Sequence, residues 1–254
     1  MESFFFGDTD QQLYGVFHAA NIEAYQGRSV LLLYPVGQEY MRIHRAYRRL
    51  ADRLADAGFD VLRFDYACTG DSQGNFEDAS VDGWVTSALN AYDELHAMVP
   101  DSKIDLVSLR IGTIIARQLS AQRKVNKLVL WEPQISDSEF LAQLRSDIDL
   151  KGETRSNFID AQSVLHSNGF SYSVKLQDEL DFSNWNEHDR VRASRILALG
   201  TESNVGLKRF GKLLLENMSV VAVPGPDDWT VVDSMGGVFL PEPSLRAITE
   251  WLNE

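Results

Sequence analysis

The five residues from Ser108 to Gly112 have the setting of a catalytic turn, but their middle residue is an arginine. They read Ser-Leu-Arg-Ile-Gly and stand between a predicted strand, 104–109, and a predicted helix, 112–119. A tight strand-to-helix turn of this kind can lift a nucleophilic serine above a sheet. A guanidinium stays protonated and cannot attack a carbonyl carbon. Arg110 therefore cannot be a nucleophile, and we expect Ser108 to pack beneath the turn.

The acid and the base of a serine–histidine–acid triad are also incompletely represented. Where the nucleophile stands in a strand-to-helix turn of this kind, the acid follows a later strand and the base follows the last one. Glu202 follows such a later predicted strand. The base would come after the last strand, yet no histidine follows His188. Without a base, a serine hydroxyl is a weak nucleophile. The sequence therefore predicts that the serine–histidine pair is lost.

Two roles remain open for Arg110 at the floor of a pocket. The first is a permanent ion pair with a carboxylate, because a buried guanidinium without a partner is strongly destabilising. The second is binding of a ligand carboxylate or phosphate by its planar fork. The backbone N–H of Ile111 at the helix start would help, as would the loop of Gly37, Gln38 and Glu39. The candidate carboxylates at the loop ends are Glu39, Asp65, Glu132, Glu202, Asp227 and Asp228.

Four further residues could take part in chemistry, although two of them have a plainer interpretation. His44 belongs to an arginine-rich run that indicates a solvated helix face, and its alternative place is the rim of the pocket. Cys68 could be a nucleophile, but a lone cysteine with no histidine nearby is more often a packing residue. Ser72 is a second unconventional nucleophile. His188 could fold over the pocket, but it stands in the wrong chain order for a triad.

Composition and charge exclude several classes of protein. The chain has 254 residues, a net charge of −13 and one cysteine. Such an acidic surface repels phosphate backbones and anionic membranes, so we expect no nucleic-acid or membrane partner. The N-terminus lacks a signal-peptide pattern, no apolar stretch is long enough to span a bilayer, and a lone cysteine fits a reducing compartment. These features predict a cytoplasmic protein, and no motif for a metal or other cofactor is present.

Short aliphatic runs alternate with amphipathic stretches along the chain, as in a mostly parallel sheet covered by helices. Residues from about 136 to 190 break this alternation and predict a cap inserted over the end of the sheet. We therefore expect a single α/β domain. The predicted strands are Ser3–Phe6, Leu13–His18, Ser29–Tyr34, Asp60–Asp65, Ile104–Leu109, Lys127–Trp131, Arg195–Leu199 and Ser219–Val223. The predicted helices are Arg42–Ala57, Val81–Met98, Gly112–Leu119, Val205–Asn217 and Ser244–Leu252.

Three segments resemble the α/β-hydrolase superfamily. Residues 39–46, Glu-Tyr-Met-Arg-Ile-His-Arg-Ala, resemble the segment after the third strand in its serine-aminopeptidase-like, or exosortase-associated, branch. Residues 61–72 resemble the family's D-x-x-G-x-G-x-S turn, with Cys68 where a glycine is usual. Residues 128–133, Leu-Val-Leu-Trp-Glu-Pro, resemble the exit of the sixth strand. The resemblance implies the α/β-hydrolase fold, with a mostly parallel eight-stranded sheet and an inserted cap, and it places Arg110 at the nucleophile elbow.

Because fold does not fix function, two functions from different classes remain open. The first is that of a pseudoenzyme, which binds a small acyl or carboxylate ligand, or a partner protein of a biosynthetic pathway, over Arg110. The second is an esterase, thioesterase or acyltransferase with Cys68 or Ser72 as its nucleophile. The resemblance covers residues 29–134 well and 195–252 only by topology. The name of the superfamily suggests hydrolysis, but the resemblance does not decide between the two functions.

Overall fold

The computed structural model describes residues 1–134, 140–145, 157–182, 191–212, 216–225 and 240–254. Within them, one eight-stranded sheet has the order β1-β2-β4-β3-β5-β6-β10-β11. The strands β1 and β2 form an antiparallel hairpin and β2 pairs antiparallel with β4, whereas the pairs from β4 to β11 are parallel. The strands are β1 (Glu2–Phe6), β2 (Leu13–His18), β3 (Arg28–Leu33), β4 (Phe59–Phe64), β5 (Lys103–Leu109), β6 (Val125–Trp131), β10 (Ala193–Gly200) and β11 (Met218–Ala222).

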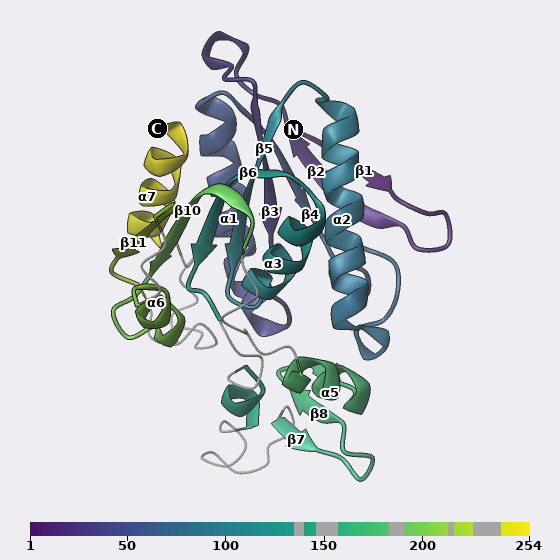
Figure 1. Cartoon of the computed structure of the whole chain (residues 1–254). Helices are drawn as coiled ribbons and strands as arrows, with labels where there is room; N and C mark the ends of the chain where they lie inside the picture. Colours follow the sequence, from purple (N-terminus) through teal and green to yellow (C-terminus); the bar gives the residue numbers. More distant parts are fainter. Residues whose placement is uncertain (135–139, 146–156, 183–190, 213–215, 226–239) are drawn as a thin grey trace.

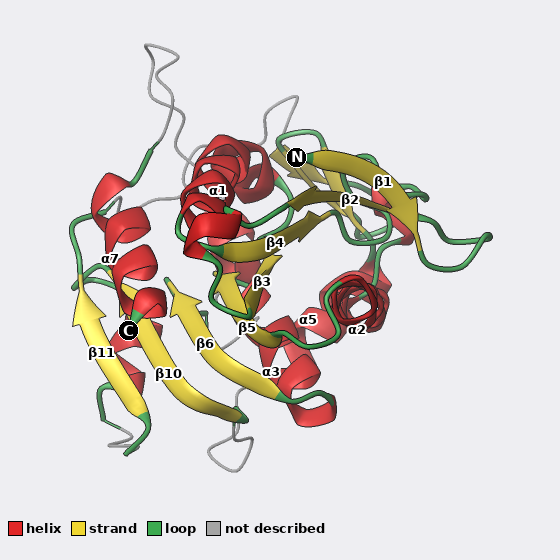
Figure 2. Ribbon diagram, turned by 90° about the horizontal axis from the view of Figure 1, so that it is seen from above, coloured by secondary structure: helices red, strands yellow, loops and turns green. Residues whose placement is uncertain are grey.

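Helices cover both faces of this sheet (Figure 2). The helices α1 (Gln38–Asp56) and α7 (Glu242–Asn253) lie on one face, and α2 (Val81–Met98) and α3 (Gly112–Gln122) lie on the other. Because both faces are covered, the central strands β3 to β6 are buried along almost their whole length. The buried apolar residues of α1 follow the i, i+3, i+4, i+7 spacing of an amphipathic helix: Ile43, Ala46, Tyr47, Leu50, Ala51 and Leu54.

The described part of residues 136–190, here called the insertion, adds no strand to the main sheet. The strands β7 (Asn157–Ile159), β8 (Leu165–Ser167) and β9 (Phe170–Tyr172) form a separate antiparallel sheet, and α5 (Val174–Phe182) follows. Figure 1 shows these elements beyond one end of the main sheet. The ring of Tyr172 packs edge-on against Phe76, which follows β4, with 5.2 Å between the ring centroids. The insertion therefore lies at the carboxyl ends of the parallel strands.

Two helix boundaries differ from the predictions by four residues or more. The helix α1 begins at Gln38 rather than Arg42, so Gln38 and Glu39 belong to its first turn and not to the preceding loop. Gly37, with a φ of +63°, makes the bend that the chain needs there, and glutamine and glutamate then favour helix. The helix α6 (Val205–Phe210) is much shorter than predicted, because it ends at a C-cap glycine, Gly211.

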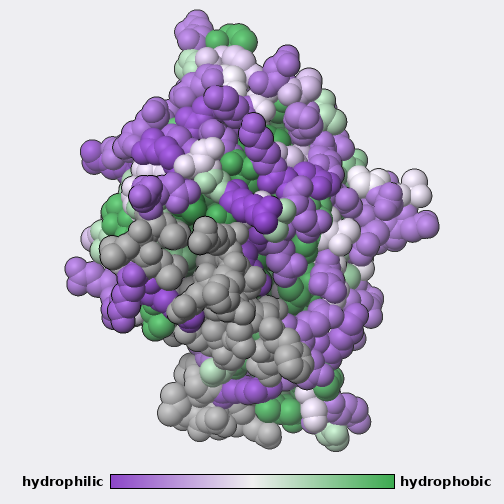
Figure 3. Space-filling model, in the orientation of Figure 1, coloured by the Kyte–Doolittle hydropathy of each residue, from purple (hydrophilic) through white to green (hydrophobic). Residues whose placement is uncertain are grey.

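The face of the molecule drawn in Figure 3 is dominated by hydrophilic side chains, with apolar ones scattered among them. This agrees with the acidic composition. Among the described residues, no helix is both long enough and apolar enough to cross a membrane.

Candidate functional site

Arg110 lies in a strained turn between β5 and α3. Its φ of +55° is in the left-handed region, which residues other than glycine rarely adopt. Its N–H donates to the carbonyl oxygen of Trp131 at 3.0 Å, and its own carbonyl accepts from the N–H of Thr113 at 2.9 Å. A Cβ atom at Gly112 would lie 2.9 Å from the carbonyl oxygen of Leu33. The close approach of β3 thus requires a glycine after the turn.

The guanidinium of Arg110 forms a buried ion pair with Glu39. Its Nε atom donates to Oε1 of Glu39 at 3.0 Å, and its Nη2 atom lies 2.9 Å from the same oxygen. The side chains of Arg110 and Glu39 are 11% and 2% exposed. Nη2 also donates to Oε1 of Gln143, in the insertion, at 3.0 Å. One side chain therefore joins the turn after β5, the first turn of α1 and the insertion.

The position of Glu39 suits a carboxylate. It lies in the first turn of α1, where the helix dipole stabilises negative charge. Its second oxygen, Oε2, is buried and has no hydrogen-bond partner among the described residues. Arg110 is thus the main group that compensates the buried charge of Glu39.

A second buried carboxylate, Glu132, lies at the end of β6. Its φ is +46°, and its Oε1 accepts the N–H of Thr201 at 2.7 Å. Burial raises the pKa of Glu132, while hydrogen bonds from Thr201 and the charge of Arg110 oppose that rise. A Cβ atom at Gly200 would lie 3.2 Å from the carboxylate, so a glycine in β10 leaves room for it. Glu132 therefore connects the ends of β6 and β10 next to Arg110.

A cavity of about 420 Å³ opens between these groups. It lies at the ends of β5, β6 and β10, and most of the residues that line it are polar. One lining residue, Gln134, has a buried Oε1 atom without a partner among the described residues. The lining residues include Arg110, Glu132, Gln134, Gln143, Ser203 and Asn204.

Tyr172 of the insertion covers the loop between β3 and α1. A Cβ atom at Gly37 would lie only 2.2 Å from the hydroxyl oxygen of Tyr172. The tyrosine is fully buried, and burial together with the charge of Glu39 raises its pKa. Phe76 and Phe140 pack edge-on against its ring, with 5.2 and 5.9 Å between centroids. An aromatic side chain thus fills the space over the Gly37 loop.

Other predicted site residues have no described hydrogen bond or ion pair with Arg110. Glu202 is exposed in the turn after β10, and His44 is exposed on α1, where its ring stacks on Tyr34. Asp65 accepts from the hydroxyl of Tyr40 at 2.7 Å. Three predicted residues lie outside the described part of the chain: His188, Asp227 and Asp228.

The candidate nucleophiles Cys68 and Ser72 have packing roles in the loop after β4. The hydroxyl of Ser72 donates to the carbonyl of Asp65 at 2.7 Å and accepts the N–H of Tyr14 at 2.9 Å. Burial and the nearby Asp78 raise the pKa of the Cys68 thiol, the opposite of what an activated thiolate needs. Ser108 is fully buried and donates to a strand carbonyl, as we expected for a packing residue.

The insertion contains a serine, a histidine and an aspartate in one hydrogen-bonded chain. The Oγ of Ser171 lies 3.0 Å from Nδ1 of His166, and Nε2 of His166 lies 3.1 Å from Oδ2 of Asp160. The connectivity is that of a catalytic triad. However, Ser171 and His166 are direct cross-strand partners in the β8–β9 pair, so the sheet register already brings them together. Asp160 also accepts two backbone N–H groups of the tight turn after β7.

Sequence reasoning did not identify Gln143, Gln134 or Ser171 as site residues. Gln143 and Ser171 come from the insertion, whose polar and aromatic composition gave no periodic signal. The one available signal for Gln134 was its position directly after the Glu132-Pro133 strand exit. Among the described residues, no group of three or more histidine, cysteine or acidic side chains could hold a metal ion.

No protein-family model matches the sequence, and no curated protein sequence matches it significantly. Solved structures do match. Est1E from Butyrivibrio proteoclasticus with bound ferulic acid has a TM-score of 0.69 and 16% identity, over 98% of this chain and 97% of that one. Proline iminopeptidase from Mycobacterium smegmatis has a TM-score of 0.63 and 14% identity, over 99% and 97%. Mouse alpha/beta hydrolase domain-containing protein 10 has a TM-score of 0.60 and 15% identity, over 100% and 97%. At these identities the similarity concerns the fold alone.

Proposed function

The chain has the α/β-hydrolase fold, and on that premise we propose that it binds a small ligand without hydrolysing it. We also propose that it belongs to the serine-aminopeptidase-like branch, on the three segments that resemble that branch. An activated nucleophile and a base are what hydrolysis on this fold requires. The proposal is that this chain has lost both.

The observation that carries the proposal is the ion pair of Arg110. On this fold the nucleophile stands in the turn between the strand and helix that correspond to β5 and α3. Arg110 occupies that turn with the left-handed backbone conformation of such a residue. Its guanidinium cannot attack a carbonyl, and its ion pair with Glu39 compensates its charge within the protein. The turn is thus kept as a structural feature without a nucleophile.

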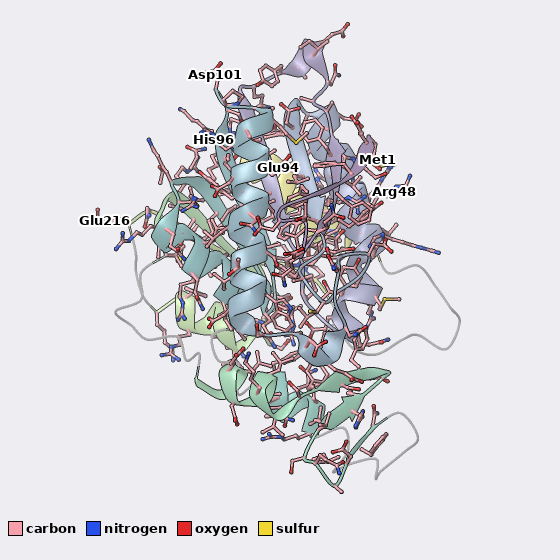
Figure 4. All side chains as sticks on the ribbon, turned by 90° about the vertical axis from the view of Figure 1, so that its right-hand side faces the viewer. Met1, Arg48, Glu94, His96, Asp101 and Glu216 are labelled. Atoms are coloured by element: carbon pink, nitrogen blue, oxygen red, sulfur yellow. The ribbon has the colours of Figure 1, made fainter. Side chains whose placement is uncertain are left out.

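The positions of the histidines also support the proposed loss of the base. His18 is bound between an arginine and an aspartate beneath α1, and His44 is exposed. His96 lies near the end of α2, on the side of the molecule away from the insertion (Figure 4). His166 belongs to β8 of the insertion. His188 precedes β10 in the chain, the wrong order for the base of this fold.

We propose that the ligand is a small acyl or carboxylate compound, or a pathway protein that presents such a group. The cavity beside Arg110 has room for a small molecule, and the Nη1 atom of Arg110 has no partner among the described residues. The acidic surface disfavours nucleic acid and anionic membranes. The charge and the lone Cys68 favour a cytoplasmic location.

A hydrolase with an unconventional nucleophile is the second candidate, and the Ser171–His166–Asp160 chain is the observation that favours it. It is the weaker candidate because the described cavities are not lined by these three residues. Catalysis by such a chain also needs oxyanion donors and a substrate pocket. Cys68 and Ser72 have no base in contact with them among the described residues.

Turnover of esters and thioesters distinguishes the two candidates. The purified protein is incubated with p-nitrophenyl esters and acyl thioesters of increasing chain length, and release of product is followed by absorbance. We expect turnover at the uncatalysed background in the wild type and in Arg110→Ser. Wild-type turnover that Ser171→Ala, Cys68→Ala or Ser72→Ala abolishes would replace the proposal by the second candidate.

A further inference from the structure

The cavity beside Arg110 presents donors and acceptors together. Arg110 contributes guanidinium N–H groups, Gln143 and Asn204 contribute amides, and Ser203 contributes a hydroxyl. Acceptors come from the carboxylate of Glu132 and the amide oxygen of Gln134. A ligand that fits this lining must itself offer both kinds of group.

The charges around the cavity do not favour an anion. Arg110 carries one positive charge, but its ion pair with Glu39 compensates that charge. Glu132 adds a second carboxylate, so the three side chains sum to −1 when Glu132 is ionised and to zero when it is protonated. A ligand carboxylate would lose its water beside these two acids without meeting a net positive charge.

Gln134 supplies a hydrogen-bond acceptor that the protein does not use. The residue is 3% exposed, and its Oε1 atom has no partner among the described residues. A buried carbonyl oxygen without a donor is unfavourable. The terminal torsion of a glutamine is soft, so a small rotation can turn this oxygen toward a donor in the cavity. Arg110 lines the same cavity, and its Nη1 atom has no hydrogen-bond acceptor among the described residues.

We propose that this cavity binds a neutral carboxamide in preference to a carboxylate. The amide oxygen accepts from Nη1 of Arg110, and the amide N–H donates to Oε1 of Gln134. This rests on the proposed function and specifies its ligand class. A carboxylate of the same shape offers no donor and adds a charge, and an ester also lacks the donor. A site that supplies an acceptor for an N–H group rejects analogues without that group.

Matched compounds test the proposal. Binding of butanamide, butanoate and methyl butanoate, and of their hexanoyl and octanoyl homologues, is measured at neutral pH by ligand-observed NMR with the whole chain. We expect each amide to bind about tenfold more tightly than the carboxylate and the ester of equal length. In Gln134→Leu this preference falls to about twofold or less, as one lost hydrogen bond implies. Gln122→Leu, at the far end of α3, is the control and keeps the full preference.

Each outcome separates this proposal from the proposed function. Equal or tighter binding of the carboxylates overturns the carboxamide proposal and leaves the proposed function standing. A preference for amides that survives in Gln134→Leu overturns the role of Gln134. No binding of any compound overturns both ligand assignments. Release of methanol from the esters, visible in the same spectra, overturns the proposed absence of hydrolysis. If Gln134→Leu does not fold, the wild-type comparison of amide, acid and ester decides.

Discussion

The Nε and Nη2 atoms of Arg110 lie 3.0 and 2.9 Å from a single carboxylate oxygen of Glu39, 71 residues earlier in the chain, and Nε donates a hydrogen bond to it. Both side chains are largely buried. A buried ion pair is weak evidence for net stability, because apolar residues of the same size can often replace it. Removal of one partner alone leaves an uncompensated charge and is strongly destabilising. The main effect that we expect of a single substitution at Arg110 is therefore a loss of stability of the fold and not a change in chemistry.

The first prediction concerns Arg110→Ser. We expect the variant to gain no esterase activity, because no histidine follows the last strand to accept the proton of the new serine. We also expect its free energy of unfolding to fall by about 3–5 kcal/mol, since Glu39 is left buried and unpaired. Denaturant unfolding and p-nitrophenyl ester turnover measure the two effects.

The matched control is the double variant Arg110→Met with Glu39→Leu. It removes both charges and keeps apolar side chains of similar size. We expect it to recover most of the stability lost in Arg110→Ser. A double variant as unstable as the single one would show that the charge of Glu39 is not the cause of the loss.

The second prediction concerns the contact between the insertion and the Gly37 loop. Gly37→Ala places a Cβ 2.2 Å from the hydroxyl oxygen of Tyr172 at a backbone φ of +63°. We expect a loss of about 1–3 kcal/mol in the free energy of unfolding, from the steric clash and the backbone strain. In a Tyr172→Phe background the clash is relieved, because the next ring atom lies 3.5 Å away. Losses that simply add in the double variant would contradict this contact.

The third prediction is a dependence of stability on pH through His18. Its Nε2 accepts from Nε of Arg63 and its Nδ1 lies 3.0 Å from Asp52. Burial, and then the charge of Arg63, lower the pKa of His18 from its ordinary value of 6.5. The folded state thus favours the neutral ring. The stability that the neutral ring of His18 contributes is fully present above pH 6.5. It is lost as the pH falls through the lowered pKa that His18 has in the folded state.

Unfolding of the wild type and His18→Gln is therefore compared between pH 7 and pH 5. We expect stability to fall more steeply in the wild type, and NMR titration of His18 to give a midpoint below 6.5. The comparison with the variant is needed because Asp65 and Glu132 act in the opposite sense. Burial raises the pKa of both acids, so their protonation stabilises the fold as the pH falls further. Equal pH slopes in the two proteins would contradict the assignment to His18.

The hydrophobic pattern was enough to predict the main sheet. Runs such as 29–34 and 104–109 are long, aliphatic and flanked by helical stretches, so local sequence and tertiary burial favour the same structure. The turn at Arg110 could also be located, because a strand, a helix and Gly112 flank it directly. The start of α1 was misplaced by four residues, since Gly37 was read as part of a longer loop.

The partners of Arg110 could not be predicted in the same way. Six carboxylates stood at loop ends, and only the packing of α1 against the sheet brings Glu39 to the turn. Gln143 and Tyr172 come from the insertion, whose position depends on ring packing between Tyr172 and Phe76 and not on any local pattern. The hydrophobic periodicity of the sequence therefore did not predict the contacts between distant segments.

The proposed loss of an activated nucleophile is tested most directly by covalent labelling with a fluorophosphonate, which reacts with activated serines. The intact mass of the wild-type protein is recorded after incubation with the probe, beside an active serine hydrolase as a positive control. We expect no adduct, because the turn holds Arg110 and no histidine follows the last strand. A stoichiometric adduct on any serine, with Ser171 as the first to examine by peptide mapping and Ser171→Ala, would contradict it.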